Sequence, residues 1–215
     1  MQVDVAKHLG AVTRTVIQRE YQGKPAKVVI ATRTYETTPD DLWDALTSPE
    51  RLPRWFLPIE GDLKVGGRYQ LKGNAGGEIL KCDKPALLAV TWEMQGQASW
   101  VEVKLAPEGS ERTKLTLEHV AHVPDDFWNQ FGPGAVGVGW ELGLLGLALH
   151  LAAGPKSAHP DADGWSTTDE GKNYVRGSSD GWGKAHALSG EDAQVALTSA
   201  ERTRQFYTGE PPPAG

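Results

Sequence analysis

Six short runs of alternating apolar and polar residues follow one another in the middle of the chain. They cover residues 61–65, 68–72, 78–83, 87–94, 100–105 and 113–120. Glycine and proline separate them, as at Gly66-Gly67 and Lys84-Pro85. Because a period of two is typical of strands with one buried face, the pattern predicts an antiparallel meander.

Two β-rich runs and a helical corner come before the meander. Residues 12–21 and 27–35 are separated by turn-forming residues, so we expect a leading hairpin. Thr38 then stands before Pro39 and two aspartates, which is the composition of a helix N-terminus. We expect a short helix there, followed by a second helical piece over residues 50–56.

The last long apolar segment spans residues 135–151. Its large apolar side chains recur every three or four residues, at Val136, Trp140, Leu144, Leu147 and Leu151. This spacing predicts one apolar face on a helix of about 25 Å, long enough to cross a sheet. Glu141 and His150 within the segment argue for a core helix and against a membrane span.

The order of these elements predicts an α+β fold. A sheet with one solvated face must bury its other face, and the long helix is the element that can cover it. Beyond residue 154, capping-box spacings predict two more helices, over residues 169–188 and 191–207. We expect the end at Pro211-Pro212-Pro213 to be disordered. The chain thus divides into a domain of residues 1–153 and a helical extension of residues 154–215.

Composition limits the function classes. The chain has 215 residues with 22 basic and 28 acidic side chains, a net charge of -6, which disfavours nucleic acid as a partner. Cys82 is the single cysteine, and residues 1–10 lack the apolar run of a signal peptide. We therefore expect a cytoplasmic protein.

Seven motifs together resemble one superfamily. They are Pro39-x-x-Leu42-Trp43-x-x-Leu46, Glu50-Arg51-Leu52-x-x-Trp55-Phe56, Gly66-Gly67-Arg68-Tyr69, Gly77-Glu78-Ile79, Pro85-x-x-Leu88 before Thr91-Trp92, residues 113–119, and Gly139-Trp140 before Leu144. In this order they resemble the START/polyketide cyclase/Bet v-like (SRPBCC) superfamily, in its activator-of-heat-shock-chaperone-ATPase-like branch.

The resemblance implies a helix-grip fold: a curved antiparallel sheet wrapped around the long C-terminal helix, with a cavity between them. It implies no single activity, because relatives of this fold include lipid carriers, cyclases, stress-response proteins and chaperone cofactors. The chain departs from the pattern in its added leading strand, in a longer approach to the final helix at residues 125–138, and in the tail after residue 154.

Two residues are candidates for acid or base chemistry. His119 shares a strand face with Leu115 and Leu117, so it points inward if they do. It then serves as a polar anchor or a general acid/base, or it is a structural histidine bonded to a backbone carbonyl. Glu78, with Leu80 and Cys82 on its side of a strand, is an inward carboxylate or a surface one.

No metal and no cofactor are expected. His119 and His122 have a short metal-ligand spacing, but no second ligand pair follows. Gly132-x-Gly134-x-x-Gly137 matches the dinucleotide motif in letters only, because no apolar strand precedes it.

Aromatic side chains dominate the elements that would enclose the cavity. Ligand sites are concave, largely apolar and supplied with a few polar groups. The candidate ligand-binding residues are Trp55, Phe56, Tyr69, Trp92, Trp100, His119, Phe127, Trp128, Phe131, Trp140 and Leu144. They predict binding of a small hydrophobic molecule, such as a lipid or polyketide-like metabolite.

Two alternatives stay open. One is a cyclase, aromatase or hydrolase that uses His119, although the common hydrolase and metalloprotease motifs are missing, so we expect binding rather than catalysis. The other is a protein-interaction module, with a homodimer or protein partner bound through residues 155–207.

Overall fold

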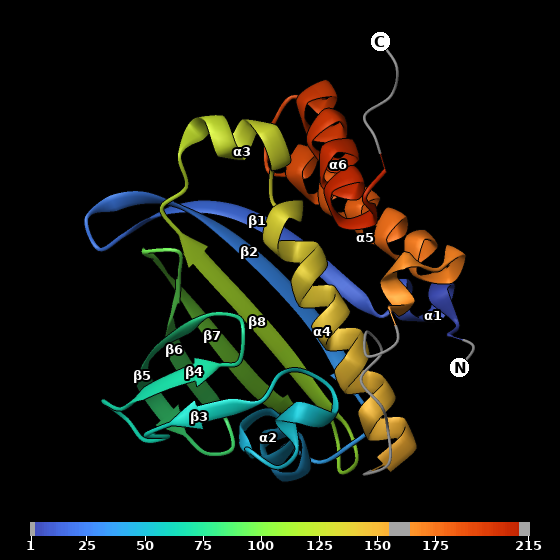
Figure 1. Ribbon diagram of the computed structural model, residues 1–215. Helices are drawn as coiled ribbons and strands as arrows, with labels where there is room; N and C mark the ends of the chain where they lie inside the picture. The colour runs from blue at the N-terminus through green and yellow to red at the C-terminus, as the bar shows by residue number, and fades with distance from the viewer. Residues whose placement is uncertain (1–2, 155–163, 211–215) are drawn as a thin grey trace. The chain divides into compact units, whose positions relative to one another are not determined.

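The predicted α+β, helix-grip architecture is confirmed in the computed structural model, which describes residues 3–154 and 164–210 (Figure 1). Eight strands form one sheet in the order β1-β2-β8-β7-β6-β5-β4-β3. The strands are β1 Val12–Tyr21, β2 Lys24–Tyr35, β3 Ile59–Gly61, β4 Arg68–Leu71, β5 Gly76–Asp83, β6 Leu87–Met94, β7 Gln97–Pro107 and β8 Thr113–Ala121. The helices are α1 Val5–Gly10, α2 Pro39–Thr47, η1 Leu52–Arg54, α3 Asp125–Phe131, α4 Gly134–Ala153, η3 Trp165–Thr167, α5 Asp169–Leu188 and α6 Ala193–Thr208.

The contacts group the chain into two compact units. Unit 1 consists of Met1–Ala31, His122–Leu142 and Pro160–Gly215, and unit 2 consists of Thr32–Ala121 and Gly143–His159. Strand β2 and helix α4 therefore contribute residues to both units. The division into a domain of residues 1–153 and an extension of residues 154–215 stays a prediction.

Unit 2 contains most of the sheet, and its two faces follow from the alternation in the sequence. On β8, Leu115, Leu117 and His119 are buried, whereas the residues between them are partly exposed. The inward orientation of His119 is therefore confirmed. The Tyr35 hydroxyl donates a hydrogen bond to the carbonyl of Leu144 at 3.0 Å, so this buried face of the sheet meets the middle of α4.

The helical corner of unit 2 begins where the sequence predicts. The Thr38 hydroxyl accepts a hydrogen bond from the Asp41 backbone N–H and caps α2, and η1 corresponds to the second helical piece. The strand predicted over residues 61–65 is wrong. β3 ends at Gly61, whose φ of +126° suits glycine, and Asp62 to Gly67 form turns.

Helix α4 is long and apolar enough to cross a membrane by length and composition. Its burial does not follow the single predicted face, because Val136 is exposed while Val138, Leu145 and the polar Glu141 are fully buried. The prediction that Val136 belongs to the buried face is therefore wrong. Within unit 1, Gly137 lies against the Trp182 indole of α5 and Gly139 against the Tyr207 hydroxyl of α6, so this half of α4 is also contacted by the C-terminal helices.

The predicted C-terminal helices are confirmed as α5 and α6, in unit 1. A buried ion pair is at the centre of this unit: the Arg14 guanidinium of β1 donates two hydrogen bonds of 2.6 Å to the Glu141 carboxylate of α4. The Tyr174 hydroxyl of α5 donates to the Glu141 carbonyl. Helices α1 and α3 were not anticipated, and the proposed disorder at Pro211-Pro212-Pro213 lies outside the described residues.

Candidate functional site

The inner face of the unit 2 sheet carries a buried polar pair, His119 and Ser99. His119 on β8 lies opposite Val101 of β7, and its Nε2 atom is 2.8 Å from the Ser99 hydroxyl. That hydroxyl donates its one proton to the Trp92 carbonyl at 3.0 Å. The Ser99 oxygen must then accept from His119, which assigns the proton of the neutral imidazole to Nε2.

The protonation state of His119 follows from its burial. Desolvation lowers the pKa of His119 to about 4, so the imidazole is neutral at pH 7. A base of this strength is poorly matched to proton transfer near neutral pH. The arrangement therefore favours a fixed hydrogen-bonding group over a general base.

Trp92 and Ser99 share the His119 face. They are direct partners in the β6–β7 ladder, on the same side as the Val90–Val101 pair, and both are only half-buried. Side chains on this face are therefore left partly open beside the buried histidine. Trp100 follows Ser99 in the strand, so its side chain lies on the opposite face, with its partner Val120. The structure does not bring Trp100 together with His119.

Tyr69 lies on the same inner face, on β4. It pairs with Gly77 of β5, and its hydroxyl donates to the Thr91 carbonyl of β6 at 2.7 Å. The phenol reaches across β5 because Gly77 has no side chain; a Cβ there would lie 2.1 Å from the Thr91 oxygen. Burial raises the pKa of Tyr69, so the hydroxyl stays protonated as a donor.

Trp55 and Phe56 follow η1, and Phe56 packs beside the middle of α4. Their rings stack with centroids 5.4 Å apart, and the Trp55 indole N–H donates to the Ala45 carbonyl at 2.9 Å. The Phe56 ring lies 3.7 Å from the position that a Cβ on Gly143 would take. Trp55 and Phe56 thus form an aromatic pair within unit 2, and Leu144, which follows Gly143 on α4, is buried in the same unit.

The other four predicted ligand residues, Phe127, Trp128, Phe131 and Trp140, belong to unit 1. Trp128 is buried, with its ring in edge contact with His186 at 5.1 Å and the Lys27 amine 5.0 Å from its centroid. Phe127 is exposed and contacts Phe131, whose ring contacts Phe206 of α6. The eleven residues therefore fall into two groups, and a single shared cavity stays a prediction.

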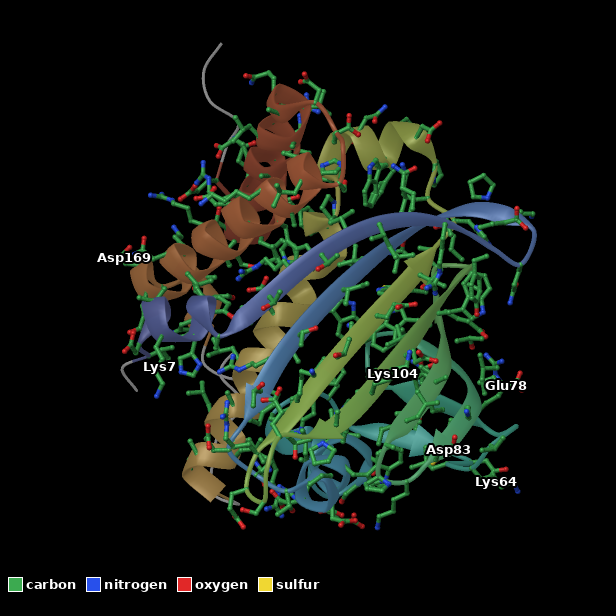
Figure 2. The ribbon with its side chains drawn as sticks, turned by 180° about the vertical axis from the view of Figure 1, so that it is seen from behind. Lys7, Lys64, Glu78, Asp83, Lys104 and Asp169 are labelled. Atoms are coloured by element: carbon green, nitrogen blue, oxygen red, sulfur yellow. The ribbon has the colours of Figure 1, made fainter. Side chains whose placement is uncertain are left out.

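Of the two placements considered for Glu78, the structure has the surface one and not the inward one. Glu78 pairs with Arg68 on β4, its backbone N–H donates to the Thr91 hydroxyl, and it lies on the face opposite Ile79, which is the buried residue. Leu80 is 41% exposed and Cys82 is exposed. A register shift between Ile79 and Lys81 breaks the alternation that the prediction assumed. Figure 2 labels Glu78 on β5, seen from behind.

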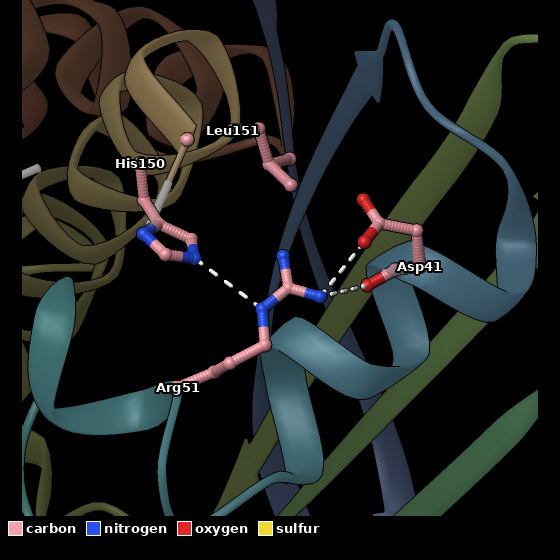
Figure 3. A pocket seen from close by; sticks show the side chains of 5 residues that line it. Asp41, Arg51, His150 and Leu151 are labelled. Carbon is pink, nitrogen blue, oxygen red and sulfur yellow. Dashed lines mark hydrogen bonds and ion pairs between the residues drawn. The ribbon is translucent and has the colours of Figure 1, made fainter. Parts of the chain in front are cut away.

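A second group of polar residues surrounds Arg51, beside a pocket of about 320 Å³ (Figure 3). The Arg51 Nη1 atom donates to the Asp41 carboxylate at 2.8 Å, to the Asp41 carbonyl at 3.2 Å and to the Asp44 carboxylate at 2.9 Å. Its Nε atom lies 3.4 Å from Nε2 of His150, which is almost fully buried. The pocket is lined by Asp41, Arg51, His150, Leu151 and Gly154.

Charge states in this pocket follow from its contacts. Burial lowers the pKa of His150, and the positive charges of Arg51 and Arg54 lower it further, so the imidazole is neutral and can accept from Arg51. Burial alone would raise the pKa of Asp41, but hydrogen bonds from Thr37 and Arg51 outweigh it and the pKa is lowered.

Ser99 and the pocket residues were not predicted as site residues. Ser99 carried a signal, because it is the one polar residue in the alternating series with Val101, Val103 and Leu105. The pocket carried none, since Asp41 and His150 are far apart in the sequence. Among residues 3–154 and 164–210, no group of three or more His, Cys, Asp and Glu side chains could hold a metal ion.

Comparison with known proteins gives the family. Residues 36–152 match the family model described as Activator of Hsp90 ATPase homolog 1-like protein. A comparison with curated proteins gives no match.

Solved structures agree with this match. The chain is 31% identical to CalU16 from Micromonospora echinospora in its crystal structure, with a TM-score of 0.66, over 85% of this chain and 99% of that one. The solution structure of CalU16 gives 30% identity and a TM-score of 0.67, over 83% and 97% of the two chains. EF2215 from Enterococcus faecalis, a conserved protein of unknown function, shares the fold at 19% identity and a TM-score of 0.58, over 87% and 96%. The chain belongs to the Activator of Hsp90 ATPase homolog 1-like family, within the SRPBCC superfamily.

Proposed function

We propose that this protein binds a small, largely apolar molecule against the inner face of the unit 2 sheet, beside His119, and that it does so in the cytoplasm. The observation that carries the proposal is the half-buried Trp92 and Ser99 next to a buried, neutral histidine. An aromatic wall with one or two fixed polar groups is the usual composition of a small-molecule site.

The polar groups suggest which ligands fit. His119 is uncharged at neutral pH, and burying an unpaired charge beside it would cost several kcal/mol. An uncharged ligand with one hydroxyl or carbonyl oxygen, and an otherwise apolar body, is the best match. A lipid or polyketide-like metabolite has this chemistry.

Native mass spectrometry of the protein purified from its host tests the proposal. We expect an added mass that organic extraction removes. Replacing Trp92 with Ala should abolish the added mass, because the substitution removes the wall of the site. Trp100→Ala is the matched control: it removes the same kind of side chain, also half-buried, from the opposite face of the neighbouring strand, and should keep the ligand. An equal loss in both variants, or a protein without bound mass, would overturn the proposal.

The cyclase or hydrolase alternative requires His119 to transfer a proton during the reaction. A general base with a pKa of about 4 contributes little at pH 7, so this observation supports binding over catalysis.

A chaperone-cofactor function is the second candidate. The family description favours it, and unit 1 has exposed leucines on its C-terminal helices: Leu188 is 89% exposed and Leu197 is 62% exposed. We expect the full chain to stimulate the ATPase of a purified Hsp90-type chaperone, and the double variant Leu188→Ser, Leu197→Ser to do so less. Met94→Ser, an exposed apolar side chain of unit 2, is the control. No stimulation by the unchanged chain would exclude this candidate.

A further inference from the structure

One side of the Arg51 guanidinium is occupied by hydrogen bonds, and its other side faces the pocket. Nε and Nη1 make all the hydrogen bonds described above, to His150, Asp41 and Asp44. Among the residues that the structure describes, Nη2 has no hydrogen-bond partner, and it points into the pocket in Figure 3. Two N–H donors in a fixed orientation are therefore available to a guest molecule.

An acceptor stands beside these donors. The Asp41 carboxylate accepts one hydrogen bond on each oxygen, from Arg51 on Oδ1 and from Thr37 on Oδ2. Each carboxylate oxygen can accept two, so Asp41 can receive one more donor from the pocket. The pocket thus presents a donor and an acceptor side by side.

The surrounding charges nearly cancel. Arg51 and Arg54 oppose Asp41 and Asp44, and His150 is neutral. The C-terminal end of α4, at Gly154, adds a partial negative charge from its last carbonyls. An anion in the pocket would meet the Asp41 carboxylate and this helix end, and a cation would meet the Arg51 guanidinium.

Leu151 supplies the apolar side of the pocket. Among residues 3–154 and 164–210, nothing lies within 4 Å of the position that a Cβ on Gly154 would take. The volume of about 320 Å³ lies at the small end of the range for ligand pockets.

We propose that the Arg51 pocket binds an uncharged group with a hydrogen-bond donor next to an acceptor, such as a primary carboxamide or a pair of neighbouring hydroxyls, attached to a small apolar body. The acceptor of the guest bonds to Arg51 Nη2 and its donor bonds to Asp41. This site is independent of the proposed binding at His119.

Three probes that share a phenyl ring test the chemistry: benzamide, N,N-dimethylbenzamide and benzoate. Binding is followed by shifts of the Leu151 methyl and His150 ring resonances in the full-length protein. We expect benzamide to bind, dimethylbenzamide to bind several-fold more weakly because it cannot donate to Asp41, and benzoate to be weakest. Tighter binding of benzoate, or no shift at Leu151 and His150 with any probe, would overturn the proposal.

Two variants separate the roles of the residues. Arg51→Lys keeps the charge but removes Nη2, and should weaken benzamide roughly tenfold, the effect of losing a hydrogen bond to a charged group. Arg68→Lys, in an exposed ion pair with Glu93, is the matched control and should leave binding unchanged. If Arg51→Lys lowers the melting temperature strongly, Asp41→Asn is measured instead, and it should reduce the preference for benzamide over dimethylbenzamide. Unchanged benzamide affinity in a folded Arg51→Lys variant contradicts the site.

Discussion

At the scale of single residues, His119 links stability to pH. Its pKa of about 4 in the folded protein lies below the ordinary value of 6.5, so the unfolded chain binds the proton more readily. The contribution of His119 to stability is therefore complete above about pH 6.5 and is lost as the pH falls towards 4. The full effect is about 3 kcal/mol.

Urea unfolding of the protein and of His119→Gln, at pH 7 and at pH 4.5, measures this contribution. We expect the variant to be less stable at pH 7, because it loses the hydrogen bond between the imidazole and the Ser99 hydroxyl. The difference in unfolding free energy should shrink by about 2–3 kcal/mol on acidification. A difference that stays constant between the two pH values would show that the folded histidine titrates normally.

Gly77 gives a second prediction at this scale. Gly77→Ala places a methyl group 2.1 Å from the Thr91 carbonyl, in the gap that the Tyr69 phenol crosses. We expect a loss of about 2–4 kcal/mol in unfolding free energy, from strain and from the displaced phenol. Gly10→Ala, where nothing lies within 4 Å and the backbone is not left-handed, tests whether the loss comes from the close approach or from glycine loss alone.

Residue orientation was predictable where the alternation is regular and not where it breaks. His119 on β8 follows a regular strand, and its inward orientation is confirmed. The register shift after Ile79 is set by how β5 pairs with β6, which the sequence of β5 alone does not contain. For Trp100 the alternation was present but unused: Val101 and Leu105 share the buried face, so Trp100 had to lie on the other.

At the scale of secondary-structure elements, the Arg14–Glu141 pair joins β1 to α4. Burial raises the pKa of the Glu141 carboxyl, and Arg14 opposes that shift. Arg14→Met leaves a buried acid without its partner and should cost about 3–5 kcal/mol in urea unfolding. The double variant Arg14→Met, Glu141→Leu should recover most of this loss. Arg68→Met, which breaks an exposed pair, should cost less than about 1 kcal/mol.

The elements themselves were largely predictable. The predicted cap located α2, which begins at Thr38. The capping-box spacings predicted α5 and α6 in the right places, but their observed caps are Thr168 and Asp192 and not the serine and threonine residues of those boxes. Helix α3 was missed because it has seven residues and no side-chain cap. The burial of α4 was misjudged for a different reason: its polar Glu141 is buried by pairing with Arg14, which hydrophobic spacing cannot indicate.

At the scale of the whole molecule, a bound ligand must raise the thermal stability of the folded protein. A ligand at a hundred times its Kd stabilises the folded chain by about 2.7 kcal/mol. For a chain of this size we expect ligand removal by organic extraction and refolding to lower the Tm by roughly 5–10 °C. Adding back the extracted material should restore the Tm of the protein, and should not do so for Trp92→Ala. An extract that leaves the Tm unchanged would argue against a specific ligand.

During synthesis, α4 is complete before the helices that contact its first half have been made. Its first half contacts Trp182 and Tyr207, and Tyr207 is made 54 residues after the helix ends at Ala153. At ribosomal speed that interval lasts roughly 3–11 s, during which an apolar helix waits for its neighbours. Substitutions in α5 or α6 should therefore lower the yield of newly made protein, through aggregation of nascent chains, before they affect the finished molecule.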